Sequence, residues 1–390
     1  MMDTWNRSGD EVLSTLQDVV AIESVNPSLP GGDAGEVGMV AYLSRFFEVN
    51  GIPFELSEVL PGRSNIVATL EGEDSQRALL FECHMDTAST QVMTIPPFKP
   101  HIRDGLLYGR GSCDTKAGGV AMIHAMKRLV ESGLRPPRSI VYAGVVDEEH
   151  LMRGSRHLAA HTQVEAAVVA EPTSLEVIRA HKGLVRFNVV ISGKAAHSSK
   201  PHLGVNAISK MARLIVRIEA ELGSSFAALE DPLLGNPTLN IGTVSGGVQI
   251  NFVPDRCEIA VDCRLLPGQT PKGVLSLFEQ LIAQSRAEDA ELEVEIEAPF
   301  MTCSPLGTAE DAPIVQNAAA ACNTILGYHV IGGVPYGTDG SALADYDVPT
   351  IVLGPGSIDQ AHGAVEWVEC EQVLRAVDIY ESLMRSACAE

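Results

Sequence analysis

Six acidic and histidine residues are spread along the 390-residue chain in an order that suits a hydrolytic site with two metal ions. They are His84, Asp114, Glu148, Glu149, Glu171 and His362. Two imidazoles and three carboxylates can hold two divalent ions, and the remaining carboxylate is then free to carry protons. A purely structural metal site has no use for that sixth group, so the set favours a hydrolase.

His84 and Asp86 lie two residues apart at the end of a predicted strand, so their side chains can face the same way. One can bind a metal ion through an imidazole nitrogen. The other can accept a hydrogen bond from that ring and fix its tautomer. The alternative is a surface histidine beside an ordinary loop aspartate.

Asp114 follows a glycine-rich turn, Gly109-Arg110-Gly111-Ser112-Cys113, and precedes a predicted helix. A carboxylate at this position could bridge two ions, with one oxygen on each. The same stretch could instead cradle a phosphate group. However, it lacks the third glycine of the dinucleotide fingerprint, and the chain has no G-x-x-x-x-G-K-[ST] motif. We therefore favour the metal-binding interpretation.

Three consecutive acids, Asp147, Glu148 and Glu149, end another predicted strand. They repel one another unless cations lie nearby, and a solvated loop is the simplest alternative. Because neighbouring side chains diverge, Glu149 could bind a metal ion while Glu148 reaches the attacking water as general base and later acid.

The last two candidates are Glu171, at the end of a further predicted strand, and His362, after a Gly-Pro-Gly-Ser loop. Either residue alone could be structural. Nitrogen and oxygen ligands without thiolates suit two divalent ions of zinc, and cobalt or manganese can substitute.

Short apolar runs alternate with helical patterns in the first 180 residues, which predicts an α/β fold. The predicted strands are 66–70, 78–81, 140–143 and 167–170, with a helix at about 118–129. Continuous apolar strands separated by helices are typical of a largely parallel sheet covered on both faces. Most candidate ligands follow the C-terminal ends of such strands, where open α/β sheets place their sites.

The pattern changes after Lys182, where alternating apolar residues begin a βαββαβ order. We predict that residues 183–298 form an inserted, ferredoxin-like domain. Residues 1–182 and 299–390 would together form the catalytic domain, with a strand at 349–353 leading towards His362.

Composition narrows the class of protein further. The net charge of −22 disfavours binding to nucleic acid or to anionic membranes. Eight cysteines occur without a CxxC pair, which predicts buried reduced thiols. We see neither a secretory signal nor a run of about 20 apolar residues, so we expect a cytoplasmic protein.

Together these motifs resemble the di-zinc family that contains acetylornithine deacetylase, succinyl-diaminopimelate desuccinylase, aminoacylase and bacterial glutamate carboxypeptidase. The resemblance covers nearly the whole chain. It implies two zinc sites that share one carboxylate: His84 and Glu171 at the first, Glu149 and His362 at the second, and Asp114 at both. It also implies that Asp86 orients His84 and that Glu148 delivers hydroxide to an amide carbonyl.

The predicted insertion matches the family pattern too. By this resemblance, His197 in Ala-His-Ser-Ser reaches the partner subunit's active site and stabilises the tetrahedral oxyanion. Asn251 and Arg264 resemble the residues that hold the substrate carboxylate, for which a planar guanidinium is well suited. The resemblance therefore implies a homodimer formed through residues 183–298.

Two segments, 179–183 and 353–362, look most like acetylornithine deacetylases. Desuccinylases typically carry an arginine after the Asp-Gly of one loop, but here Thr338-Asp339-Gly340 is followed by Ser341. We take Gly337 and Thr338 as further candidate substrate contacts. The expected activity is removal of an acyl group, most simply acetyl, from an N-acyl amino acid such as N2-acetylornithine.

Several alternatives stay open at this stage. A dipeptidase, a carboxypeptidase or another N-acyl-amino-acid hydrolase, succinyl-diaminopimelate desuccinylase included, would use the same scaffold. A non-catalytic metal-binding homologue is an alternative of another class. Cys83 and Cys113, which lie beside the predicted ligands, put the shape of the pocket and hence the acyl group in doubt.

Overall fold

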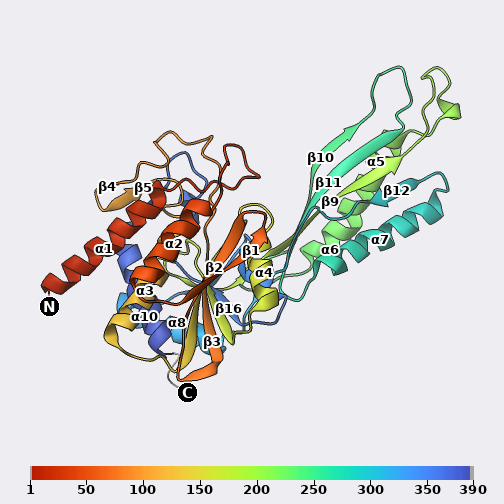
Figure 1. The fold of residues 1–390 in the computed structure, drawn as a ribbon. Helices are drawn as coiled ribbons and strands as arrows, with labels where there is room; N and C mark the ends of the chain where they lie inside the picture. Colours follow the sequence, from red (N-terminus) through yellow and green to blue (C-terminus); the bar gives the residue numbers. More distant parts are fainter. Residues whose placement is uncertain (1, 387–390) are drawn as a thin grey trace. The chain divides into compact units, whose positions relative to one another are not determined.

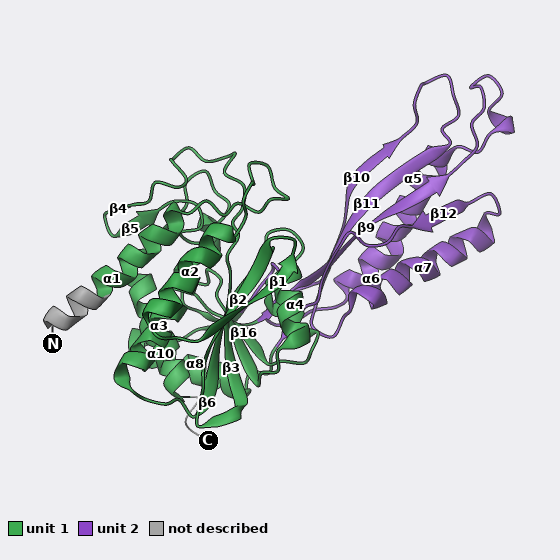
Figure 2. Ribbon diagram, in the orientation of Figure 1, with its two compact units in different colours: residues 1–179, 308–332, 338–390 green, residues 180–307, 333–337 purple. Residues whose placement is uncertain are grey.

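The computed structural model describes residues 2–386, with side chains from residue 9 onwards. It forms two compact units (Figure 2). Within the described residues, unit 1 comprises 2–179, 308–332 and 338–386, and unit 2 comprises 180–307 and 333–337. The predicted insertion, 183–298, lies inside unit 2. Unit 2 extends further because β13 (Met301–Cys303) pairs with β9 (Gly183–Ser192) in the same sheet.

Unit 1 is built on a mixed sheet whose strands lie in the order β1-β2-β6-β3-β7-β16-β8 (Figure 1). The four central strands are parallel: β6 (Arg138–Val145), β3 (Asp74–His84), β7 (Ala166–Val169) and β16 (Thr350–Val352). Two flanking strands, β2 (Arg63–Leu70) and β8 (Val177–His181), are antiparallel to the central strands that they pair with. The edge strand β1 (Phe54–Leu60) is antiparallel to β2 and so runs in the same direction as the central strands. The predicted α/β class, with a mostly parallel sheet, is confirmed.

Helices bury both faces of the central strands. One layer contains α1 (Met2–Ala21), α2 (Val37–Val49), α3 (Lys116–Ser132), α8 (Pro313–Leu326) and α10 (Cys370–Ser386), and its core includes Phe81 of β3. The two helices α4 (Arg153–His161) and α9 (Gly340–Ala344) pack against each other, α4 over β1, β2 and β6 and α9 over β16. Because both faces are covered, β6 is apolar along most of its length and β3 is apolar from Ala78 to Phe81, without alternation.

Two small elements complete the neighbourhood of the site in unit 1. A three-stranded sheet joins β17 (Trp367–Glu369), β5 (Leu106–Tyr108) and β4 (His101–Arg103). The short helix η3 (Ile358–Gln360) lies just before His362. Within the part of the chain that the structure describes, no helix is long and apolar enough to cross a membrane.

Unit 2 has the predicted ferredoxin-like order, and its sheet is antiparallel with strands in the order β10-β11-β9-β12. The elements along the chain are β9, α5 (Ala207–Ile218), β10 (Thr238–Gly246), β11 (Arg256–Leu265), α7 (Pro271–Glu288) and β12 (Glu293–Ile296). Alternate residues of β9, from Val185 to Ile191, enter the core beneath α5 and α7. Shorter elements are η1 (Pro201–Leu203), η2 (Glu219–Gly223) and α6 (Ser224–Ala227). Two short strands, β14 (Leu306–Gly307) and β15 (Ile331–Val334), pair with β8.

Candidate metal centre

The five predicted ligands converge at the carboxyl edge of the parallel strands of unit 1. Ligand atoms of His84, Asp114 and Glu171 lie within 4.8 Å of one another, and so do those of Asp114, Glu149 and His362. His84 ends β3, while Glu149 and Glu171 follow β6 and β7. Asp114 precedes α3. The topology thus places residues from distant parts of the chain at one edge of the sheet, as open α/β sheets do.

Asp114 belongs to both groups, with one carboxylate oxygen in each. Its Oδ1 lies 3.2 Å from Nε2 of His84, and its Oδ2 lies 3.1 Å from Nε2 of His362. The third members complete the groups, because Glu171 Oε1 is 3.8 Å from the His84 nitrogen and Glu149 Oε2 is 3.1 Å from the His362 nitrogen. Two ligands of a tetrahedral ion at about 2.1 Å are about 3.4 Å apart, so the residues fit two ions that share one carboxylate.

The tautomer of His84 is set by a backbone carbonyl. Its Nδ1 lies 2.9 Å from the carbonyl oxygen of Asp86 and donates to it, so Nε2, which lies 3.2 Å from Oδ1 of Asp114, is the nitrogen that a metal ion would take. The Asp86 carboxylate is 3.7 Å from Nδ1, too far for a hydrogen bond. It accepts instead from the side chain of Asn26 at 2.6 Å and from the backbone N–H groups of Glu148 and Glu149 at 3.1 and 3.2 Å.

This geometry corrects the predicted role of Asp86. The residue does fix the imidazole, but through its main chain. Its buried carboxylate is taken by the two successive N–H groups of the loop after β6, since those donors point at it while the ring nitrogen does not. The side chain of Asp86 therefore positions the peptide that carries the candidate base.

The repulsion expected among three consecutive acids is relieved by separate partners. Arg153 donates to both oxygens of Asp147 at 2.5 and 2.9 Å, and Arg63 lies 3.3 Å away. Burial alone would raise the pKa of Asp147, but hydrogen bonds from Arg153 and Asn26 outweigh it and lower that pKa. Glu36 accepts from the Asp147 N–H and pairs with Arg63. None of these partners had a recognisable signal in the sequence.

Glu148 is the acid without a cationic partner of its own. Burial raises its pKa well above the usual value, and the negative charges of Glu171 and Asp339 add to this, although His84 acts in the opposite direction. A carboxyl group with a raised pKa can both accept and return a proton near neutral pH. This is the property that a general base needs if it later acts as the acid.

A second acidic feature, which the sequence did not reveal, lies behind the ligands. Glu82 is buried in β3, and burial, followed by the nearby charge of Asp339, raises its pKa well above the usual value. An ionised Glu82 would leave both its oxygens without a donor. A protonated Glu82 can donate to Asp339, which also accepts from the hydroxyl of Ser155. Burial raises the pKa of Asp339 as well, so these two carboxyl groups form a buried acidic pair.

The predicted contacts in unit 2 fall at two different places. His197 is exposed, with Nδ1 2.8 Å from the hydroxyl of Ser199, and it bridges to Phe252 so that Asn251 lies beside it. Arg264 is at the opposite end of β11, where it pairs with Leu184. The eight steps along the strand from position 256 to 264 span about 27 Å. Asn251 and Arg264 of one chain therefore cannot hold the same carboxylate, and the expectation that both contact it requires residues of two different chains.

The loop before α9 also differs from expectation. Thr338 is fully buried, and its hydroxyl accepts the N–H of Gly340 at 3.1 Å, so it anchors the start of the helix and exposes no surface to a substrate. Gly337 lies at the end of unit 2, and a Cβ there would come within 2.6 Å of the Cys303 sulfur. The glycine is needed for close packing.

The thiols beside the ligands do not join the metal groups. Cys83 donates to the carbonyl oxygens of His84 and Thr115 at 3.2 and 3.4 Å, and Cys113 donates to that of Ser357 at 3.3 Å. Burial raises the pKa of both thiols, so they stay protonated. All seven described cysteines are buried thiols, as predicted, and Cys388 lies outside the described residues.

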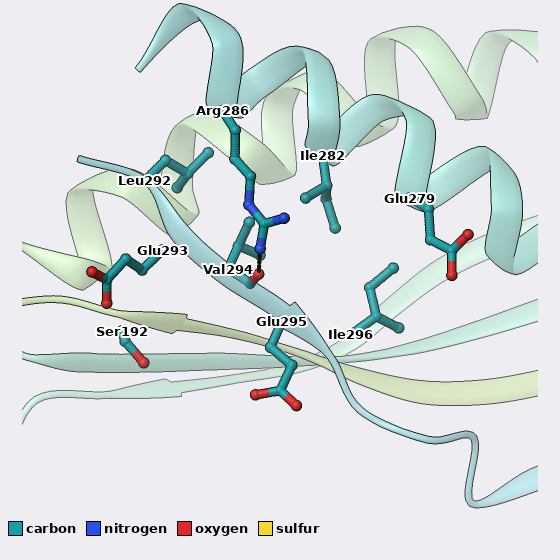
Figure 3. A pocket seen from close by; sticks show the side chains of 9 residues that line it. All are labelled: Ser192, Glu279, Ile282, Arg286, Leu292, Glu293, Val294, Glu295 and Ile296. Carbon is teal, nitrogen blue, oxygen red and sulfur yellow. Dashed lines mark hydrogen bonds between the residues drawn. The ribbon is translucent and has the colours of Figure 1, made fainter. Parts of the chain in front are cut away.

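A separate cavity of about 710 Å³ lies in unit 2 between α7 and β12 (Figure 3). Arg286 crosses it to donate to the carbonyl oxygen of Val294. Its lining combines aliphatic side chains with three glutamates, Glu279, Glu293 and Glu295. Nothing in it resembles the ligand groups of unit 1, so the chemistry resides in unit 1.

Comparison with known proteins agrees with this geometry. Residues 80–386 match peptidase family M20/M25/M40. The chain is 30% identical over 382 residues to an acetylornithine deacetylase of Vibrio vulnificus, covering 96% of this chain and 98% of that one.

Solved structures share the fold. The aminopeptidase PepT of Bacillus cereus superposes with a TM-score of 0.80 at 21% identity, covering 98% of this chain and 99% of that chain. A dinuclear metal-binding peptidase of Bacillus subtilis superposes with a TM-score of 0.73 at 15% identity, with the same coverage. The match to the family pattern, the near-complete coverage of the relative and the paired ligand groups lead to one conclusion: the chain belongs to peptidase family M20/M25/M40 and is a metal-dependent hydrolase.

Proposed function

We propose that this hydrolase removes an acyl group, most simply acetyl, from the α-nitrogen of an amino acid such as ornithine, using two zinc ions. The observation that carries the proposal is the position of Asp114, whose two oxygens face two separate ligand groups beside Glu148. The relative from Vibrio vulnificus, named acetylornithine deacetylase, supports the choice of substrate. The nitrogen and oxygen ligand set supports zinc.

The residues of unit 1 have separate roles in amide hydrolysis. Zinc, when bound, supplies a Lewis acid for the amide carbonyl and lowers the pKa of water. His84 presents its Nε2 lone pair because the Asp86 carbonyl holds its Nδ1 proton. The Glu148 carboxylate takes a proton from the attacking water and later returns it to the leaving nitrogen. Asp86 holds the backbone of Glu148 in place for both transfers.

A cationic cluster in unit 2 supports recognition of the substrate carboxylate by Arg264. Asp262 is shared by two guanidinium groups, at 2.9 Å from Nε of Arg264 and 2.6 Å from Nε of Arg186. Burial lowers the pKa of Lys182, and the positive charge of Arg264 lowers it further, which places the two cations near each other. Asp262 and Asp231, whose negative charge also acts on Lys182, are two acids among three cations, and a substrate carboxylate would supply the missing negative charge.

The edges of the unit 2 sheet support a homodimer through the insertion. At one edge, β12 carries Glu293 and Glu295, and charged edge strands resist pairing. The other edge is β10 (Figure 1). This strand has no charged residue, and it exposes Val244. The loop that follows exposes Val248 and Ile250 almost completely. We propose that β10 and this loop meet a second copy of the chain.

In such a dimer the two neighbouring loops that carry His197 and Asn251 lie next to the proposed interface. We propose that His197 and Asn251 of the partner subunit complete the site, whereas Arg264 acts within its own subunit. The separation of Asn251 from Arg264 along β11 supports this division. A cytoplasmic location is supported by the buried thiols.

A substrate panel tests the proposal directly. Protein loaded with zinc is assayed on N2-acetylornithine, on other N-acetyl and N-succinyl amino acids and on dipeptides at equal concentration. The proposal predicts the highest kcat/KM for an N-acetyl amino acid and loss of turnover on chelation. A higher kcat/KM for dipeptides would favour a dipeptidase, and full turnover by the chelated protein would exclude a metal-dependent mechanism.

A further inference from the structure

Glu366 is a buried carboxylate that touches the candidate bridging residue from behind. Its Oε1 accepts the backbone N–H groups of Cys113 and Asp114 at 2.9 and 3.0 Å. Its other oxygen, Oε2, lies 2.5 Å from a guanidinium nitrogen of Arg110. The main-chain oxygen of Glu366 also accepts the N–H of Gly109 at 3.1 Å. One residue thus holds both ends of the glycine-rich turn that leads to Asp114.

The place of Glu366 in the chain links two ligands. It follows His362 by four residues and immediately precedes β17, where Trp367 pairs with Tyr108 of β5. This pairing sets the His362 segment beside the turn that carries Asp114. Glu366 is fully buried and both its oxygens are engaged, so it is a support for the ligands and takes no place among them.

Arg110 balances the buried charge. It is 1% exposed, pairs with Glu366, and donates to the carbonyl oxygen of Ser89 at 2.8 Å. A buried acid beside Asp114 without this partner would repel that carboxylate. Because Arg110 neutralises its charge, the buried Glu366 carboxylate can lie beside Asp114 without repelling that carboxylate.

The two N–H bonds allow Glu366 to fix the direction of the Asp114 side chain. Donors from successive residues on one oxygen fix the peptide plane between Cys113 and Asp114, and with it the direction of the Asp114 side chain. A carboxylate shared by two groups has to aim its oxygens 3.2 and 3.1 Å from two different imidazoles at once. Such a ligand tolerates less rotation than one that faces a single ion.

We propose that Glu366 is a positioning residue for the shared carboxylate of Asp114, acting through the N–H groups of Cys113 and Asp114, with Arg110 as its counter-charge. The inference rests on the proposed two-metal function of the site. The positioning of Asp114 is attributed to the Glu366 oxygen that accepts the two N–H bonds, and not to the ion pair with Arg110.

A matched pair of double variants separates these two causes. Arg110→Met/Glu366→Gln removes the ion pair but keeps an amide oxygen for the two N–H groups, whereas Arg110→Met/Glu366→Met removes both. Glu165→Gln, which weakens the ion pair of Glu165 with Arg77 and Arg138 in unit 1, is the control. The dissociation constants of Zn²⁺ and Co²⁺ are measured by competition with a chromophoric chelator, together with the absorption spectrum of bound Co²⁺, kcat and KM.

The Met/Met variant is expected to bind the two ions about 10–100-fold more weakly, with an altered cobalt spectrum and a lower kcat at little-changed KM. The Met/Gln variant and the Glu165→Gln control are expected to stay close to wild type. Equal weakening in both double variants, or no weakening in either, overturns the proposal. If the double variants do not fold, Glu366→Asp is measured against the same control. This substitution shortens the Glu366 side chain by one methylene. An unchanged affinity for the metal ions then overturns the proposal.

Wild type and Asp114→Asn are run alongside. If wild type fails to bind two ions, or if Asp114→Asn binds them as well as wild type does, the proposed function itself fails. If both behave as expected while the Glu366 variants match wild type, only the positioning role fails.

Discussion

Replacing Asp86 with alanine separates two roles that a carboxylate next to His84 can have. The variant keeps the backbone carbonyl that accepts from the imidazole Nδ1 at 2.9 Å. It loses the carboxylate that accepts the N–H groups of Glu148 and Glu149 at 3.1 and 3.2 Å. We therefore expect the variant to misplace the candidate base Glu148 and to leave the orientation of the candidate metal ligand His84 unchanged.

The magnitudes follow from these contacts. A buried N–H left without an acceptor costs about 1–3 kcal/mol, and two of them are left here. Because Glu148 and Glu149 are only half-buried, water can replace part of the loss, so we expect the free energy of unfolding to fall by about 2–3 kcal/mol. Misplacing a catalytic group by about 1 Å costs about 100-fold, which is the decrease expected in kcat.

The assay measures kcat on enzyme saturated with zinc and, separately, the affinity for zinc by chelator competition. We expect the affinity to stay within about tenfold of wild type, below the loss that usually follows removal of a group that orients a metal-bound histidine. A larger fall in affinity with a normal kcat for the saturated variant would show that the Asp86 carboxylate orients His84 after all.

Three further outcomes are expected. Lys116→Met should lower the free energy of unfolding by about 2–4 kcal/mol in urea denaturation, because its buried ammonium donates to two carbonyls at the end of α1, at 2.9 and 2.8 Å. An unchanged midpoint would refute this capping role. Hydrogen bonds with Asp114 and Glu149 raise the pKa of His362 to about 10, so the metal-free imidazole is protonated below that pH. Loading zinc at pH 8 should then release a proton at His362, detected by calorimetry in buffers of different ionisation heat, and affinity should rise by about tenfold per pH unit. Val244→Lys should shift the protein to a monomer in light scattering and lower kcat, whereas Glu293→Lys at the other edge should leave the mass unchanged.

Much of the fold followed from local pattern. The apolar runs around Ile140 and Val168 predicted buried parallel strands, and the strict alternation from Val185 to Ile191 predicted a half-buried strand, because the period of burial is set by which faces are covered. The candidate ligands could be found because parallel strands end at the same edge of a sheet. Family resemblance then suggested how they pair.

What the sequence did not show depends on contacts between distant segments. Glu366 lies 252 residues from the Asp114 N–H that it accepts, and Asn26 lies 60 residues from Asp86. Neither position carries a motif. The direction of the Asp86 carboxylate depends on which donors the folded loop brings near, and side-chain spacing does not determine this.

Two predicted substrate contacts depend on the folded backbone in a similar way. Asn251 and Arg264 are close in sequence, but most of β11 lies between them and places them at opposite ends of unit 2. Thr338 stands in a loop that resembles a substrate contact, yet its hydroxyl accepts the N–H of Gly340 in the first turn of α9. Resemblance suggests these residues as a set, and the backbone determines which of them can act together.

The central claim is that two ions are held by five ligands while Glu148 carries the proton. The most direct test is to count bound zinc per subunit and to measure kcat for Glu148→Gln. We predict two ions per subunit, as in wild type, with kcat lower by about 10²–10⁴-fold. A normal kcat would remove Glu148 as the base, and loss of zinc from this variant would show that Glu148 is itself a ligand.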